Sequence, residues 1–155
     1  MSTTVVRALV ATGLLVGLAG CESLPGLGRT GDANQMIAGT GCNPGQNVCR
    51  VDSAHLVEFV QACRDAGFEM FIDITAVDYY RQRPGPRFEL VVGLLSMSHN
   101  LRIRILVGVD GEVHSAPSIT GVYPGANFYE REVYDLFGIT FTGHPDLTRI
   151  MLPDD

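Results

Sequence analysis

The chain has 155 residues, enough for one domain of ordinary size, and 46% of them are apolar, enough for a packed core. Its formal net charge is −6 and its isoelectric point is about 5.1. A nucleic-acid binder needs a concentrated basic face, so this composition argues against that class. The four cysteines form no C-x-x-C pair and show no zinc-ligand spacing with the four histidines, which argues against a metal or iron–sulfur site.

Residues 1–21 are typical of an export leader. Arg7 precedes an apolar run over residues 8–20, and Leu18-Ala19-Gly20-Cys21 resembles a bacterial lipoprotein cleavage box. As a helix the run would extend only about 20 Å, too short to cross a bilayer. An unprocessed apolar N-terminus, or a translation start further downstream, would explain the same residues.

Residues 22–50 are predicted to form a Gly-rich linker. The stretch holds six Gly and two Pro and few large apolar residues, so ordering it would cost more entropy than burial returns. Cys42 and Cys49 could close a small disulfide loop there if the segment were exported, and would stay reduced in the cytosol.

Regular periodicity begins at residue 51. Asp52 or Ser53 is predicted to cap a helix that Gly67 ends. The apolar positions of this helix share one face and are Leu56, Val57, Val60 and Cys63.

Three strands are expected after this helix, over residues 70–77, 88–95 and 101–107. The second is apolar enough to be buried on both faces, and the third has a wet face with Arg102 and Arg104. Residues 81–87 form a loop, and Asp110-Gly111 signals a hairpin. One helix followed by strands on short turns predicts an α+β domain over residues 51–155, with a mainly antiparallel sheet.

A short motif helix is predicted near the C-terminus. Asn127 is a good N-cap, with Glu130 placed to complete a capping box, and Gly138 can end the helix in a left-handed conformation. Arg131 and Asp135, one turn apart, can pair on the outer face. The expected apolar stripe consists of Tyr129, Val133, Leu136 and Phe137.

The sequence over residues 127–155 resembles the signature of the C subunit of respiratory complex I. The resemblance rests on Glu130-Arg131-Glu132, Asp135-Leu136-Phe137-Gly138, Gly143-His144-Pro145-Asp146-Leu147 and Arg149-Ile150, and it extends upstream through residues 74–79 to about residue 51. The chain departs from the family in three places. Phe128 replaces a usual Trp, Thr148 replaces a usual basic residue, and the sequence stops at Asp155, where the family continues. Known members also lack a lipoprotein-like leader.

The resemblance implies a non-catalytic peripheral-arm subunit of a proton-translocating NADH:quinone oxidoreductase. Such a protein packs chiefly against the large quinone-site subunit, and reaches the cytoplasmic face of the bacterial inner membrane through the complex. NADH, FMN, iron–sulfur clusters and quinone would belong to partner subunits, with no cofactor and no active site in this chain. The residues implied at the partner interface are Glu130, Arg131, Glu132, Asp135, His144, Asp146 and Arg149.

Other functions compete with this interpretation. A hydrolase is disfavoured because Glu130 and Glu132 point about 160° apart on a helix, and His144 has no nucleophile at a motif-like spacing. The charged helix face could be ordinary solvated surface. The leader favours a lipid-anchored extracytoplasmic binding module attached through Cys21. The corresponding subunit of a membrane-bound hydrogenase would carry the same motif.

Overall fold

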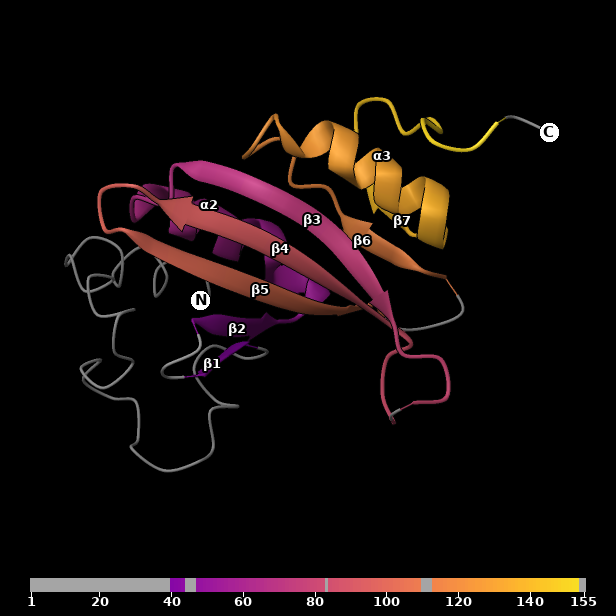
Figure 1. Ribbon diagram of the computed structural model, residues 1–155, viewed down its shortest axis with the longest axis horizontal. Coiled ribbons are helices and arrows are strands. Elements are labelled where there is room, and N and C mark those ends of the chain that lie inside the picture. The colour runs from indigo at the N-terminus through magenta and orange to yellow at the C-terminus, as the bar shows by residue number, and fades with distance from the viewer. Residues whose placement is uncertain (1–39, 44–46, 83, 110–112, 154–155) are drawn as a thin grey trace.

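The computed structural model describes residues 40–43, 47–82, 84–109 and 113–153, with side chains from residue 47 onward. Figure 1 shows a sheet with α2 behind it and α3 beside β3. In chain order the elements are β1 (Thr40–Asn43), β2 (Val48–Val51), the 3-10 helix η2 (Ser53–His55), α2 (Leu56–Asp65), β3 (Met70–Asp78), β4 (Phe88–Ser96), β5 (Leu101–Val109), β6 (Ser115–Pro117), α3 (Ala126–Phe137) and β7 (Thr140–Thr142).

The main sheet has five strands in the order β1-β2-β5-β4-β3. All neighbouring strands are antiparallel except β2 and β5, which are parallel. The short strands β6 and β7 form a second, parallel pair. The predicted fold class is therefore confirmed: an α+β domain with a mainly antiparallel sheet, a helix before its long strands and a motif helix near the C-terminus.

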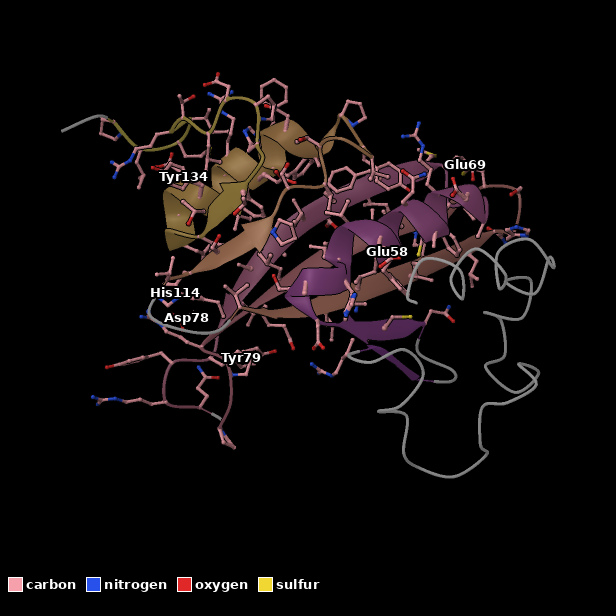
Figure 2. All side chains as sticks on the ribbon, turned by 180° about the vertical axis from the view of Figure 1, so that it is seen from behind. Glu58, Glu69, Asp78, Tyr79, His114 and Tyr134 are labelled. Carbon is pink, nitrogen blue, oxygen red and sulfur yellow. The ribbon has the colours of Figure 1, made fainter. Side chains whose placement is uncertain are left out.

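The core lies between one face of the sheet and the two α-helices. Alternate residues of β4, from Phe88 to Leu94, point into it because side chains of a strand alternate between faces. α2 contributes Leu56, Val60 and Cys63, and α3 contributes Ala126 and Val133 to the same cluster. In Figure 2, seen from behind, α2 lies in front of the sheet. Glu89, on the opposite face of β4, is also buried, and the side chains of Arg50 and Tyr79 contact its carboxylate.

The sheet begins earlier than the linker prediction allows. β2 lies mostly within residues 22–50, and it hydrogen-bonds along β5 with Cys49 and Val51 buried beneath it. β2 has only four residues, which is too few for the alternation of apolar and polar side chains to be recognised next to a Gly-rich stretch. Cys49 is disulfide-bonded, and Cys42 is its register partner in β1. The predicted leader and the Asp110-Gly111 hairpin fall outside the described residues.

α2 ends as predicted, but its start differs. Gly67 has a φ of +94° and donates its N–H to the carbonyl of Arg64, while Phe68 donates to Cys63, which is the Schellman arrangement. At the other end, Asp52 precedes η2 and makes no side-chain cap. The helix itself begins at Leu56, also without a side-chain cap, so capping by Asp52 or Ser53 was a wrong prediction.

α3 shows the same contrast. It begins at Ala126 after Gly125, with no side-chain cap, so Asn127 lies inside the helix and the predicted capping box does not form. Its end is as predicted: Gly138 has a φ of +71° and donates its N–H to Tyr134. The left-handed residue turns the chain from α3 into β7.

The two glycines that flank α3 provide a test of this geometry. A Cβ at Gly138 would meet no atom within 4 Å, so the cost of Gly138→Ala is the left-handed backbone alone, about 1–2 kcal/mol. Gly125 has a φ of −64°, and a Cβ there would make an ordinary 3.8 Å contact with Phe71. Gly125→Ala should therefore leave stability unchanged or raise it by up to about 1 kcal/mol. Urea unfolding of the two variants measures the contrast, and equal midpoints would contradict the assigned end of α3.

Candidate functional site

The buried face of α3 agrees with the prediction only in part: Val133 is buried and Phe137 packs against the core, as predicted. Ala126, Glu130 and Val133 point into the protein, whereas Leu136 is 49% exposed and Tyr129 is also exposed. The prediction placed both exposed residues in the apolar stripe and turned Glu130 outward. The placement of Glu130 was wrong because Ile119 and His144, which contact its carboxylate, come from other segments of the chain, and the periodicity of the helix carries no information about them.

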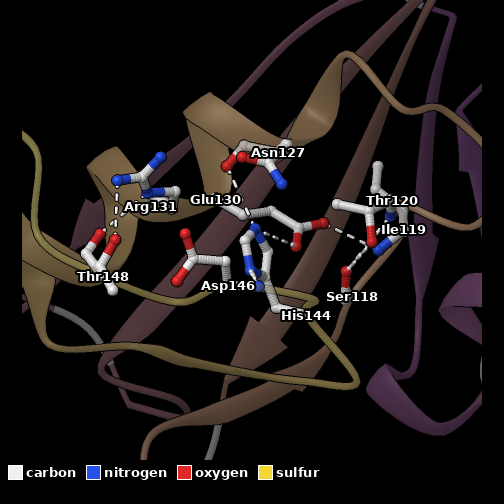
Figure 3. Close-up of polar contacts among 9 residues, drawn as sticks. All are labelled: Ser118, Ile119, Thr120, Asn127, Glu130, Arg131, His144, Asp146 and Thr148. Carbon is white, nitrogen blue, oxygen red and sulfur yellow. Dashed lines mark hydrogen bonds and ion pairs between the residues drawn. The ribbon is translucent and has the colours of Figure 1, made fainter.

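Glu130 connects α3 to the segment that follows β6. Its side chain is fully buried, and Oε1 accepts a hydrogen bond of 2.8 Å from the backbone N–H of Ile119 (Figure 3). Oε2 lies 3.9 Å from Nε2 of His144 and has no hydrogen-bond partner among the described residues. Burial raises the pKa of Glu130, and the N–H of Ile119 opposes that rise.

His144 is held beside Glu130 by two backbone contacts. Nδ1 accepts a hydrogen bond of 3.0 Å from the N–H of Asp146, so Nε2 carries the proton of the ring. That Nε2 lies 3.2 Å from the carbonyl oxygen of Asn127 on α3. The turn after β7 is thereby fastened to the first turn of α3.

Asp135 fastens the last described residues to the other end of α3. Its Oδ2 accepts three consecutive backbone N–H groups, from Ile150 at 3.1 Å, Met151 at 2.7 Å and Leu152 at 2.9 Å. Nε of Arg149 lies 3.8 Å from the other carboxylate oxygen. Burial alone would raise the pKa of Asp135, but the three N–H groups and Arg149 together hold it below its ordinary value.

Arg131 provides a further attachment. Its Nε donates to the carbonyl of Thr148 at 3.0 Å, and its terminal nitrogen donates to the hydroxyl of the same residue at 2.7 Å. The predicted Arg131–Asp135 pair is therefore replaced by two separate attachments. Both bind the segment over residues 148–152, which we call the C-terminal segment.

The seven residues implied at a partner interface thus divide into two groups. Glu130, Arg131, Asp135, His144 and Arg149 lie together and organise the C-terminal segment and the turn before it. Asp146 is exposed and Glu132 is half-buried, and the side chains of these two residues do not join that network. The outward charged face predicted for Glu130 and Asp135 is absent, because both carboxylates are buried.

Sequence reasoning missed an apolar surface in the same place. The network holds the C-terminal segment so that its consecutive apolar side chains face outward, with Met151 59% exposed. The signal in the sequence was an apolar run with no strand or helix period just before Pro153. This surface, which we call the α3 apolar surface, consists of Phe128, Tyr129, Leu136, Ile150, Met151 and Leu152.

Within the described ranges, no group of three or more His, Cys, Asp or Glu residues could hold a metal ion. No helix in the part of the chain that the structure describes is both long and apolar enough to cross a membrane. Buried polar anchors that present apolar side chains are what a protein–protein contact requires.

A family model described as the 30 kDa subunit of respiratory-chain NADH dehydrogenase matches residues 49–155. The chain belongs to this family. The resemblance on the C-terminal motif is thereby confirmed, and the matched range includes β2, in agreement with the observed sheet.

Curated relatives of the 30 kDa subunit family support the assignment. The C subunit of NADH-quinone oxidoreductase from Sinorhizobium medicae is 46% identical over 75% of this chain and 58% of its own length. The mitochondrial 30.4 kDa subunit of NADH-ubiquinone oxidoreductase from Neurospora crassa is 58% identical over 56% of this chain and 29% of its own length. The chain therefore spans little more than half, or less, of these relatives.

Two solved structures share the fold. A trypsin-resistant fragment of Nqo5 superposes with a TM-score of 0.60 at 36% identity, covering 70% of this chain and 88% of the fragment. A chain of the membrane-bound sulfane sulfur reductase, an archaeal respiratory membrane complex, gives a TM-score of 0.66 at 22% identity, over 80% of this chain and 74% of that one. The second likeness concerns the fold alone.

The role of Asp135 predicts a local effect of its removal. Asp135→Asn removes the charge that three amides share, so hydrogen exchange at Ile150, Met151 and Leu152 should accelerate while the core strands keep their protection. Glu132→Gln is the matched control, because it removes one carboxylate charge from the same helix outside the network. Unchanged exchange at the three amides in Asp135→Asn would show that the segment is held by other contacts.

The raised pKa of Glu130 predicts that its contribution to folding stability depends on pH with the opposite sign to that of an ordinary ion-paired carboxylate, whose pKa is lowered. Its pKa is raised in the folded state, so the folded state binds the proton more tightly than the unfolded chain, whose Glu titrates near about 4.3. Its contribution to stability is present below that value and is lost as pH rises through the folded pKa. The melting temperature of the parent should therefore fall, relative to that of Glu130→Gln, as pH is raised from 4.5 to 8. A difference between the two proteins that stays constant across this range would exclude the raised pKa.

Proposed function

We propose that this chain is a non-catalytic peripheral-arm subunit of a proton-translocating NADH:quinone oxidoreductase, and supports electron transfer from NADH to quinone by holding neighbouring subunits in register. Membership of the 30 kDa subunit family supports the choice of complex. In this proposal NADH, FMN, iron–sulfur clusters and quinone are bound by partner subunits. The chain lies at the cytoplasmic face of the bacterial inner membrane through its place in the complex.

The proposed partner is the quinone-site subunit of the complex, and the proposed contact is the α3 apolar surface. One observation supports the choice of this surface. One oxygen of the buried Asp135 carboxylate accepts hydrogen bonds from three backbone amides, and the residues that it holds in this way have side chains that face solvent. Such an arrangement adds little to the core, because the side chains of Ile150, Met151 and Leu152 are exposed. Exposed apolar clusters of this kind mark protein interaction sites.

Two methionines of similar exposure allow a sharp test. Met151 on the α3 apolar surface is 59% exposed, and Met97 in the β4–β5 turn is 63% exposed. Met151→Asp should weaken co-purification with the quinone-site subunit by about ten-fold or more, as expected for a side chain worth over about 1.4 kcal/mol of binding. Met97→Asp should bind like the parent, and both variants should melt near the parent temperature.

Leu136→Asp tests the same surface from the helix side and should weaken the same association. If Met151→Asp and Leu136→Asp both co-purify with the quinone-site subunit as well as the parent does, the α3 apolar surface is not the contact with that subunit. Failure of the parent itself to co-purify with the quinone-site subunit would contradict the choice of partner.

A second candidate rests on one observation. Cys49 is disulfide-bonded, and structural disulfides persist in oxidising compartments. This favours the lipid-anchored extracytoplasmic module, in which Cys21 would carry the anchor. Labelling of free thiols in protein that is denatured directly from cells separates the two candidates. Cys49 of a cytoplasmic subunit would be reduced and would react with the label, whereas Cys49 of an exported protein would be disulfide-bonded and would not react.

A further inference from the structure

The sheet has a second face that neither α2 nor α3 covers. Figure 1 looks onto this face, with α2 behind the strands. Its centre is formed by Val91 and Leu95 of β4 and Leu106 of β5, which point away from the core because they alternate with core residues. All three are half-buried, and none belongs to the core cluster or to the side chains that pack against it.

Basic side chains border this apolar centre on one side. Arg102 and Arg104 lie on the same face of β5, and Arg50 of β2 stands beside Leu106 in the parallel register. Arg102 and Arg104 are exposed, and neither guanidinium forms an ion pair or hydrogen bond with any residue that the structure describes. Neighbouring like charges such as those of Arg102 and Arg104 are unfavourable on a sheet. An acidic partner would remove that repulsion.

Polar groups between these strands are already engaged within the domain. Arg50 forms an ion pair of 2.5 Å with Glu89, whose second oxygen lies 3.3 Å from the hydroxyl of Tyr79. A Cβ at Gly93 would lie 2.4 Å from the carboxylate of Asp73, so this carboxylate lies over β4 between Val91 and Leu95. The face therefore has apolar side chains on β4 and β5, arginines along β5, and one carboxylate, that of Asp73, over β4.

We propose that this face binds an amphipathic helix of a protein partner, with its apolar side on Val91, Leu95 and Leu106 and its carboxylates toward Arg102 and Arg104. The backbone of β4 is paired on both sides, and that of β5 is paired on both sides over residues 104–106, so side-chain packing is the interaction that remains available on this face. A helix offers an apolar stripe with a charged border, and helices are the usual cover of a sheet face.

The experiment uses the full chain in its own cells. A photo-crosslinking residue, p-benzoylphenylalanine, replaces Thr75, which is exposed and stands in the row that crosses Val91 and Leu106. The control position is Gln61, exposed on α2 in the opposite layer. Mass spectrometry of the Thr75 product should identify a segment with apolar residues at helical spacing and Asp or Glu along one border, and the Gln61 product should lack it.

Charge reversal then tests the arginines. Arg104→Glu should lower the yield of that product by about ten-fold, whereas Arg81→Glu, the same change on the β3–β4 loop, should leave it unchanged. Replacing the nearest carboxylate of the partner helix by Arg should restore the yield with Arg104→Glu. Three crosslinking results would overturn the proposal: no product at Thr75, products only with lipid or with a second copy of this chain, or a crosslinked segment without carboxylates. An equal loss of crosslinking yield in the Arg104→Glu and Arg81→Glu variants would also overturn it. A partner from outside NADH:quinone oxidoreductase would support this proposal while contradicting the proposed complex, so the two fail separately.

Discussion

The bonds between Asp135 and three successive amides determine where the end of the described chain lies. Ordering each residue costs about 1–2 kcal/mol of backbone entropy, and the exposed side chains of residues 150–152 recover little of it by burial. Charge-assisted hydrogen bonds to a buried carboxylate are among the stronger interactions available to offset that cost. The C-terminal segment is therefore attached by its backbone, which leaves its side chains available for contact with another molecule.

This arrangement changes how the charged motif is understood. Charged residues at helix surfaces are usually solvated, and a motif rich in Glu, Arg and Asp suggests an electrostatic interface. Here Glu130 and Asp135 are buried, and the exposed apolar side chains of Leu136, Ile150, Met151 and Leu152 lie near Asp135. The charges organise the local backbone. The charged residues of the motif are thus distinct from the apolar residues that the same region exposes.

The sequence was sufficient for features that depend on neighbours along the chain. The long strands β3, β4 and β5 and the glycine ends of both helices follow from local periodicity and from backbone freedom at Gly67 and Gly138. The orientation of α3 did not follow, because Glu130 is buried against Ile119 and His144, and no local sequence period connects these residues to it. β2 was missed for a similar reason: its pairing partner β5 is remote in sequence, and four residues carry almost no pattern. Non-local partners therefore account for these two errors, whereas the predicted side-chain caps of α2 and α3 failed at the starts of the helices themselves.

The parallel pairing of β2 with β5 has a consequence for the order in which the domain assembles. β3, β4 and β5 are joined by short connections and can form as consecutive hairpins, which closes only small loops. β2 can add only after β5 is in place, and it closes a loop that contains α2, β3 and β4. Contacts of such separation form slowly, and the edge of β5 is unpaired until they do. Until β2 adds, the edge of β5 over residues 104–106 is open to pairing with other chains, and the addition of one short strand closes that part of the edge.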